Sequence, residues 1–110
     1  MKDIICVDKE NGVIIVNSDL RGKEDLVIET IKQYKNLFIW GGENNYMTLC
    51  PTVDVMSGVE DTNALIVANA VLEVFLADGW NETEKRSVKR IPSMERNAER
   101  YQFIIYLARG

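Results

Sequence analysis

The chain opens with two short apolar runs separated by a turn signal. Residues 4–7 and 13–16 are rich in Ile and Val, and the polar stretch between them ends in Asn11 and Gly12. An Asn-Gly pair tolerates positive φ, and β-branched runs on either side of it are typical of strands. This pattern predicts an opening β-hairpin.

Apolar residues then recur at helical spacing. Val27, Ile31 and Tyr34 stand at positions i, i+4 and i+7, and Leu26 and Ile28 widen the apolar stripe. Residues 17–19 supply capping side chains ahead of it. We therefore expect an amphipathic helix over residues 23–35.

The next segment predicts two more strands and a loop. Residues 37–40 form a compact apolar run that ends at a Gly-Gly pair, and residues 46–50 form a second run that ends at Pro51. Proline and glycine are typical of strand ends and turns. Residues 51–61 are expected to form a loop.

A second helix is the clearest element of the pattern. Residues 64–77 are nearly all apolar, and Gly79 follows them as a helix stop. Because apolar residues surround most of this helix, it should be buried on more than one side. Asn69 and Glu73 share one face, which predicts a narrow solvent stripe, or the lining of a small-molecule pocket if that face is buried.

The last part of the chain changes to polar and then apolar character. Residues 87–91 predict an exposed or edge strand and residues 101–108 a final strand, with a third helix from Ser93 as a rival interpretation. The resulting order is β-β-α-β-(β)-α-β-β. It predicts one α+β domain over residues 1–110, with a mainly antiparallel sheet and one largely buried helix packed on it.

Composition fits that fold class. The chain is 46% hydrophobic and 27% charged, as in an ordinary globular protein, and no apolar run has the roughly 18 residues that a membrane span needs. We expect a cytoplasmic protein with no membrane partner. Cys6 and Cys50 lie in predicted strands and are expected to be reduced and buried, although their spacing leaves a disulfide open.

Histidine is absent from the sequence. This removes the commonest general base and a common transition-metal ligand. No spacing of nucleophile and base is recognisable, so the sequence favours a noncatalytic protein without a metal or cofactor. A hydrolase using a carboxylate pair such as Asp54 and Glu60 remains an alternative.

Charge is segregated along the chain. No Lys or Arg occurs between residues 36 and 84, whereas a basic segment follows at residues 85–100. One interpretation is that the two blocks neutralise each other on a solvated surface. Another is that Arg86, Lys89 and Arg90 bind an anion such as a nucleotide, and a third is that the acidic block imitates nucleic acid. A pI near 4.8 argues against nucleic-acid binding.

The sequence thus favours a small protein that binds and modulates another macromolecule, such as an inhibitor, an immunity protein or a phage-type anti-defence factor. Its partner-binding candidates are Trp40, Glu43, Tyr46 and Trp80, because exposed aromatics are enriched at interfaces. An edge strand or these aromatics would also support a homo-oligomer. The alternative is a protein that binds a small anionic ligand through its basic segment.

Overall fold

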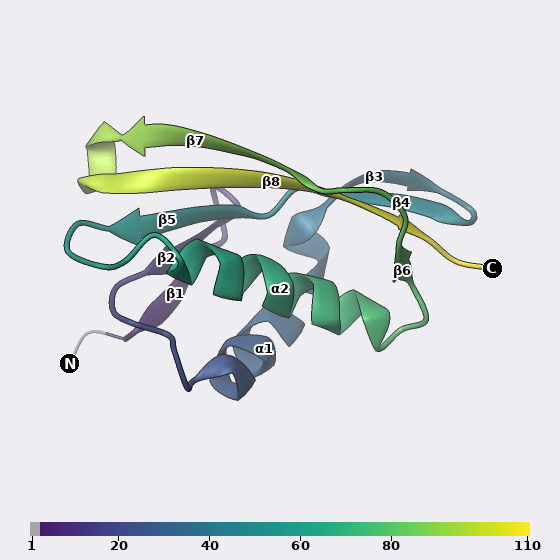
Figure 1. Ribbon diagram of the computed structural model, residues 1–110, viewed down its shortest axis with the longest axis horizontal. Coiled ribbons are helices and arrows are strands. Elements are labelled where there is room, and N and C mark those ends of the chain that lie inside the picture. Colours follow the sequence, from purple (N-terminus) through teal and green to yellow (C-terminus); the bar gives the residue numbers. More distant parts are fainter. Residues whose placement is uncertain (1–2) are drawn as a thin grey trace.

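A computed structural model describes residues 3–110, and it shows an α+β fold with one mixed sheet and two helices. Both helices lie on the same side of the sheet (Figure 1). The strands are β1 (Ile5–Asp8), β2 (Val13–Val16), β3 (Ile39–Glu43), β4 (Tyr46–Leu49), β5 (Thr52–Met56), β6 (Asn81–Glu82), β7 (Ser87–Ser93) and β8 (Ala98–Ala108). The helices are α1 (Glu24–Lys32) and α2 (Asn63–Leu76), and two 3-10 turns are η1 (Lys35–Phe38) and η2 (Met94–Arg96).

Strand β8 is the centre of the sheet. Strands β5 and β4 pair with successive parts of one of its edges, and the hydrogen bond from Phe103 N to Pro51 O (2.9 Å) continues the ladder across the break between them. Strands β7 and β6 pair along its other edge. The long apolar run near the end of the chain is therefore bordered on both sides over most of its length.

The remaining strands extend the sheet outward. Strand β2 pairs parallel with β5, and β1 pairs antiparallel with β2, while β3 pairs antiparallel with β4. The chain between β2 and β5 passes through α1 on one face of the sheet and then through the β3–β4 hairpin, and β5 enters the sheet parallel to β2. The sheet is therefore mixed, and a second helix joins the predicted one on that face.

The hydrophobic core lies between the sheet and the two helices. Val27 and Ile31 of α1 and Val71 and Phe75 of α2 are fully buried against alternate residues of the central strands. Asn63 stands at the start of α2, where its Oδ1 accepts a 2.6 Å hydrogen bond from Leu20 N. This buried amide fixes the segment before α1 against the start of α2.

Several predicted elements are confirmed and several are wrong. The opening hairpin and both helices lie within a few residues of the predicted positions. The expected loop over residues 51–61 instead contains β5, and β3 begins at Ile39 and runs through the glycine pair, because residues 35–38 form a 3-10 turn. The rival third helix is only the short turn η2, and β8 begins at Ala98.

The two cysteines are free thiols, and each is half-buried. Cys6 lies in β1, whereas Cys50 lies in the break between β4 and β5. Burial raises the pKa of the Cys50 thiol. The expectation of full burial was wrong, since neither thiol belongs to the core between sheet and helices.

Within residues 3–110, neither helix has the length and apolar character needed to cross a membrane.

Truncation of Phe75 tests the position of the core. Phe75→Ala should lower the free energy of unfolding by about 3–5 kcal/mol, because it leaves a cavity between α2 and the sheet. The matched control Leu65→Ala changes the same helix at a side chain that is 50% exposed, and should cost less than about 1 kcal/mol. Urea unfolding followed by circular dichroism measures both. Equal losses would contradict the assignment of the buried face.

Candidate functional site on the open face of the sheet

One face of the sheet faces away from both helices (Figure 1). Side chains alternate across a strand, so residues that do not join the helix-side core point to this second face. Strand register assigns a set of side chains to it, which we name the open face. Its central members are Cys6, Asp8, Val13, Ile15, Thr48, Thr52, Asp54, Met56, Arg100, Gln102, Ile104 and Tyr106.

Asp54 lies in the middle of the open face and is fully buried. It stands directly opposite Arg100 in the register of β5 and β8. Arg100 donates two hydrogen bonds to it, Nε to Oδ1 at 2.8 Å and Nη2 to Oδ2 at 3.0 Å. The pairing raises the pKa of the Arg100 guanidinium, so this cation is permanent.

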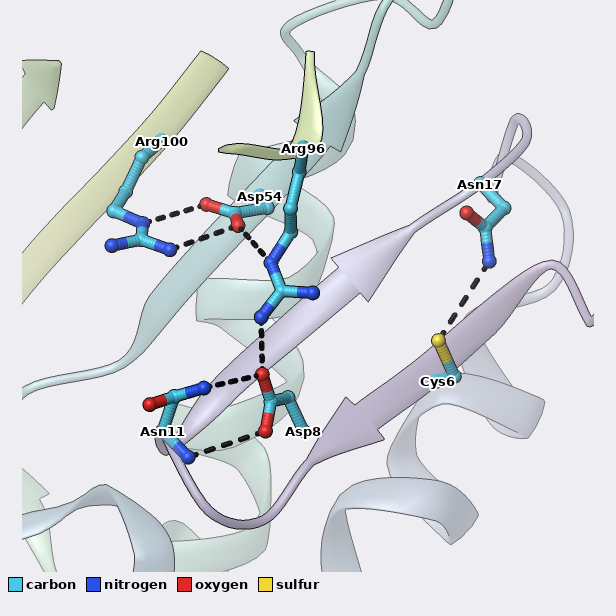
Figure 2. A network of polar contacts seen from close by, with 7 residues as sticks. All are labelled: Cys6, Asp8, Asn11, Asn17, Asp54, Arg96 and Arg100. Atoms are coloured by element: carbon cyan, nitrogen blue, oxygen red, sulfur yellow. Dashed lines mark hydrogen bonds and ion pairs between the residues drawn. The ribbon is translucent and has the colours of Figure 1, made fainter. Parts of the chain in front are cut away.

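Arg96 covers the same carboxylate from the turn between β7 and β8. The turn reverses at Asn97, whose φ of 53° is in the left-handed region that Asn tolerates. Arg96 Nε lies 3.0 Å from Asp54 Oδ2, and its Nη2 bonds Asp8 (Figure 2). Asn11 then donates to Asp8 from its side chain at 2.9 Å and from its backbone at 3.2 Å.

These contacts form one network of two carboxylates and two guanidinium groups. Asp8 comes from β1, Asp54 from β5, Arg100 from β8 and Arg96 from η2 (Figure 2). The charges balance within the network, so it offers little net attraction for an ion. Asp54 is enclosed and held by both arginines, which makes it a structural anchor and a poor general base.

Uncharged side chains cover most of the rest of the open face. Ile15, Ile104 and Tyr106 are half-buried, and Tyr46 at the end of β4 is 66% exposed. Among the strand residues that register assigns to this face, Glu43 and Lys89 are the charged ones outside the network. They lie on β3 and β7, at opposite margins of the sheet. The open face is therefore mixed, with Ile15, Ile104 and Tyr106 beside the uncharged polar residues Thr48, Thr52 and Gln102, and its central charges are already paired.

The predicted anion-binding residues are engaged within the protein or separated from one another. Arg86 makes two hydrogen bonds to Glu82, at 3.1 and 3.2 Å, and a third to Asn69 Oδ1 at 2.8 Å. Arg90 lies 3.3 Å from Glu99 and 3.8 Å from Asp61. Lys89 is exposed, and it alternates with Arg90 so that the two point to opposite faces of β7. The three cations therefore do not converge on one site.

The predicted partner-binding residues divide into two groups. Trp40 and Tyr46 are 72% and 66% exposed, and Glu43 stands opposite Tyr46 in the β3–β4 hairpin. Trp80 is only 7% exposed and belongs to the core, where the Arg109 guanidinium lies 4.3 Å from its ring centre. Trp80 therefore has little surface with which to contact a partner, because the end of α2 packs its ring inward.

The other candidates from the sequence lie apart as well. Glu60 is exposed and its carboxylate lies 3.6 Å from Arg21, whereas Asp54 is enclosed under Arg96 and Arg100. Asn69 and Glu73 are both exposed, which confirms the solvent stripe on α2. Among residues 3–110, no three Cys, Asp or Glu side chains gather in an arrangement suited to a metal ion.

Sequence reasoning missed Asp8, Arg96 and Arg100 as members of one site. The available signal was Asp54 between Val53 and Val55, a charged residue inside an alternating β-branched run. A charge at such a position requires a partner when the strand is central. Nothing local identifies that partner, because Arg100 is 46 residues away.

Removal of the central charge tests the network. Asp54→Asn should lower the free energy of unfolding by about 3–5 kcal/mol, since two largely buried guanidinium groups lose their common partner. Asp19→Asn is the matched control, because Asp19 pairs with Arg21 on the exposed surface and its loss should scarcely change stability. Urea unfolding at neutral pH measures both. An Asp54→Asn protein as stable as the wild type would contradict the anchoring role.

The pH dependence of stability tests the Asp8 end of the network. Hydrogen bonds from Asn11, then pairing with Arg96, hold the pKa of Asp8 below its usual 3.8, against an opposing contribution from burial. A lowered folded-state pKa stabilises the protein above pH 3.8, and the effect is lost as pH falls through the folded-state value. Urea midpoints of wild type and Asp8→Asn should differ at about pH 6 and converge near about pH 2. A difference that does not depend on pH would exclude this linkage.

No known protein family, curated protein or solved structure matches this chain.

Proposed function

We propose that this is a noncatalytic cytoplasmic protein that docks another protein on its open face and thereby modulates it, as an inhibitor, immunity protein or phage-type anti-defence factor does. The observation that carries the proposal is the one-sided arrangement of the fold. Both helices cover one face of the sheet (Figure 1). The opposite face carries half-buried Ile15, Ile104 and Tyr106 and exposed Tyr46 among uncharged polar residues. Sheets usually bury such a face against a second layer.

The chemistry of the open face fits a protein partner. The fully buried centre of a protein interface is depleted of charged residues and enriched in aromatic ones, with polar groups at the rim. Ile104 and Tyr106 lie in the second half of β8, and Tyr46 extends the aromatic surface to the β3–β4 hairpin. Glu43 and Lys89 provide charge at the margins.

A nucleic acid would fit this face poorly. Phosphate binding depends on cationic side chains that are available to the ligand. On the open face Arg96 and Arg100 are bound to Asp54, and the chain as a whole carries a net charge of −4. Electrostatics therefore favours a protein surface over a polyanion.

The ion-pair network supports docking by keeping the surface in one shape. It ties β1, β5, β8 and η2 together on the open face itself. A preorganised surface loses less conformational entropy on binding than a mobile one. The network therefore favours binding by keeping the surface in one shape. Its charges stay paired with one another and do not pair with the partner.

Charge insertion on the open face tests the proposal. Ile104→Arg and Tyr106→Arg, made separately, place a cation among the uncharged side chains of the surface and should weaken association at least tenfold. Leu65→Arg is the matched control, because Leu65 is half-exposed on α2 and lies on the covered side of the sheet. Tagged variants are compared with wild type for co-purification from host extract, with mass spectrometry to identify the bound protein.

The expected result is one protein that is retained by wild type and by Leu65→Arg and lost with both open-face variants. Circular dichroism confirms that each variant is folded. Retention by all variants would place the interface elsewhere. A small anion released by denaturation, and lost on replacement of Arg86 or Arg90, would favour the ligand-binding alternative.

A further inference from the structure

The outer edge of β1 carries backbone groups that face away from the sheet. Among the described strands, β1 pairs with β2 alone. Asn17 N donates to Ile4 O at 2.8 Å, which makes residues 4 and 17 a hydrogen-bonded pair. Such pairs alternate along an antiparallel ladder, so the amide and carbonyl groups of Ile5 and Val7 point outward.

A groove runs beside this edge. It has a volume of about 430 Å³, and residues 3–7 form one side of it. The other side is formed by Leu26 of α1 and by Tyr34, which follows that helix. Leu26 is 50% exposed, an unusual position for a large apolar side chain next to unpaired strand backbone. The groove therefore combines hydrogen-bonding capacity with an apolar wall.

The other outer edges are less suited to pairing. Strand β7 has Lys89, Arg90 and Pro92, and cationic residues and proline discourage the addition of a strand. Strand β3 has a register shift between Ile39 and Gly41, and a bulge of this kind interrupts an edge. Strand β1 has a regular register over its whole length.

We propose that β1 is a self-association edge, at which a second copy of this chain pairs antiparallel across a twofold axis through Cys6. This register joins the outward groups of Ile5 to those of Val7 in the second copy, and the reverse. It uses every outward backbone group of β1 that the ladder identifies. A register shifted by two residues would pair only one of the two outward residues, Ile5 or Val7, with the same residue of the second copy.

Charge complementarity favours this occupant. Asp3 and Lys9 flank β1 on either side, and the same register, continued beyond the strand, brings Asp3 of one copy near Lys9 of the other, twice by symmetry. Both residues are exposed and form no ion pair among the described residues, and the Lys9 ammonium lies 5.8 Å from the centre of the Tyr34 ring. Opposite charges directly across two strands are stabilising, whereas like charges there are destabilising.

The twofold axis also brings the two Cys6 residues together. Because residue 6 bonds toward β2, the two copies of Cys6 form a non-hydrogen-bonded pair with about 4.5 Å between Cα atoms. That separation is within the range of a disulfide. The axis is perpendicular to the sheet, so the open faces of the two copies would form one continuous surface and the two α1 helices would meet on the other side.

Sedimentation velocity over a wide range of protein concentration measures the association. Wild type should show a monomer–dimer equilibrium. Asp3→Lys or Lys9→Asp alone should weaken dimerisation about tenfold, because each variant creates two like-charge pairs, and the double variant Asp3→Lys/Lys9→Asp should restore it. A protein that stays monomeric at all concentrations, or a dimer that neither reversal weakens, would overturn the proposal.

Thiol oxidation with diamide tests the register. In this reaction two Cys6 thiols each lose a hydrogen to diamide, which is reduced to its hydrazine, and an S–S bond forms between the copies. Non-reducing electrophoresis should show a covalent dimer for wild type and for Cys50→Ser, and none for Cys6→Ser. Sedimentation should show that Cys6→Ser still dimerises. Cross-linking through Cys50, or a dimer without cross-linking at Cys6, would refute the Cys6-centred pairing.

The two proposals fail separately. The open-face variants leave β1 unchanged, so they should not alter sedimentation of the free protein. The charge reversals at Asp3 and Lys9 leave Ile104 and Tyr106 unchanged. An extended peptide that occupies the groove in place of a second copy would appear as a monomer with added mass, and would also overturn self-pairing.

Discussion

Burial of the Asp54 carboxylate costs several kcal/mol in desolvation, and the structure offsets that cost with two arginines. Arg100 supplies a planar two-bond contact from the neighbouring strand, and Arg96 covers the second carboxylate oxygen from a turn. The positions of β5, β8 and η2 relative to one another all depend on this arrangement. A shift of β5 by one residue would place Asp54 in the helix-side core and a valine on the open face, so the network also opposes the wrong register.

Ion pairing also explains the segregated charge of the chain. The acidic middle segment pairs with the basic segments on either side of it. The pairs are Asp54 with Arg96 and Arg100, Asp61 with Arg90, Glu82 with Arg86, Asp78 with Lys35, and Glu60 with Arg21. Exposed pairs of this kind contribute little individually, whereas the buried pair at Asp54 is costly to break. Charge segregation in this protein is therefore largely a matter of internal pairing.

The one-sided placement of the helices links the fold to the proposed function. The hydrophobic core lies on the helix side, where the apolar residues of α1 and α2 pack against alternate residues of the strands. On the open face the network removes charge from the centre and leaves Ile104, Tyr106 and Tyr46 around it. Docking on this face and pairing at β1 would involve different surfaces of the same sheet, so a dimer could present two docking faces side by side.

The sequence by itself determined the elements whose pattern is local. Val27 and Ile31 at helical spacing, the apolar run of α2 and the Asn-Gly turn of the first hairpin each act over a few residues, so their positions were predictable. Only the tertiary structure decided the role of β5, because Pro51 and Gly58 are typical of a loop while its burial comes from pairing with β2 and β8. The candidate site was likewise not predictable, since Asp8, Asp54 and Arg100 are distant in the chain and are joined, with Arg96, only when β1, β2, β5 and β8 are in register. Local propensity acts through neighbours in sequence, whereas a buried ion-pair network is selected by which strands lie side by side.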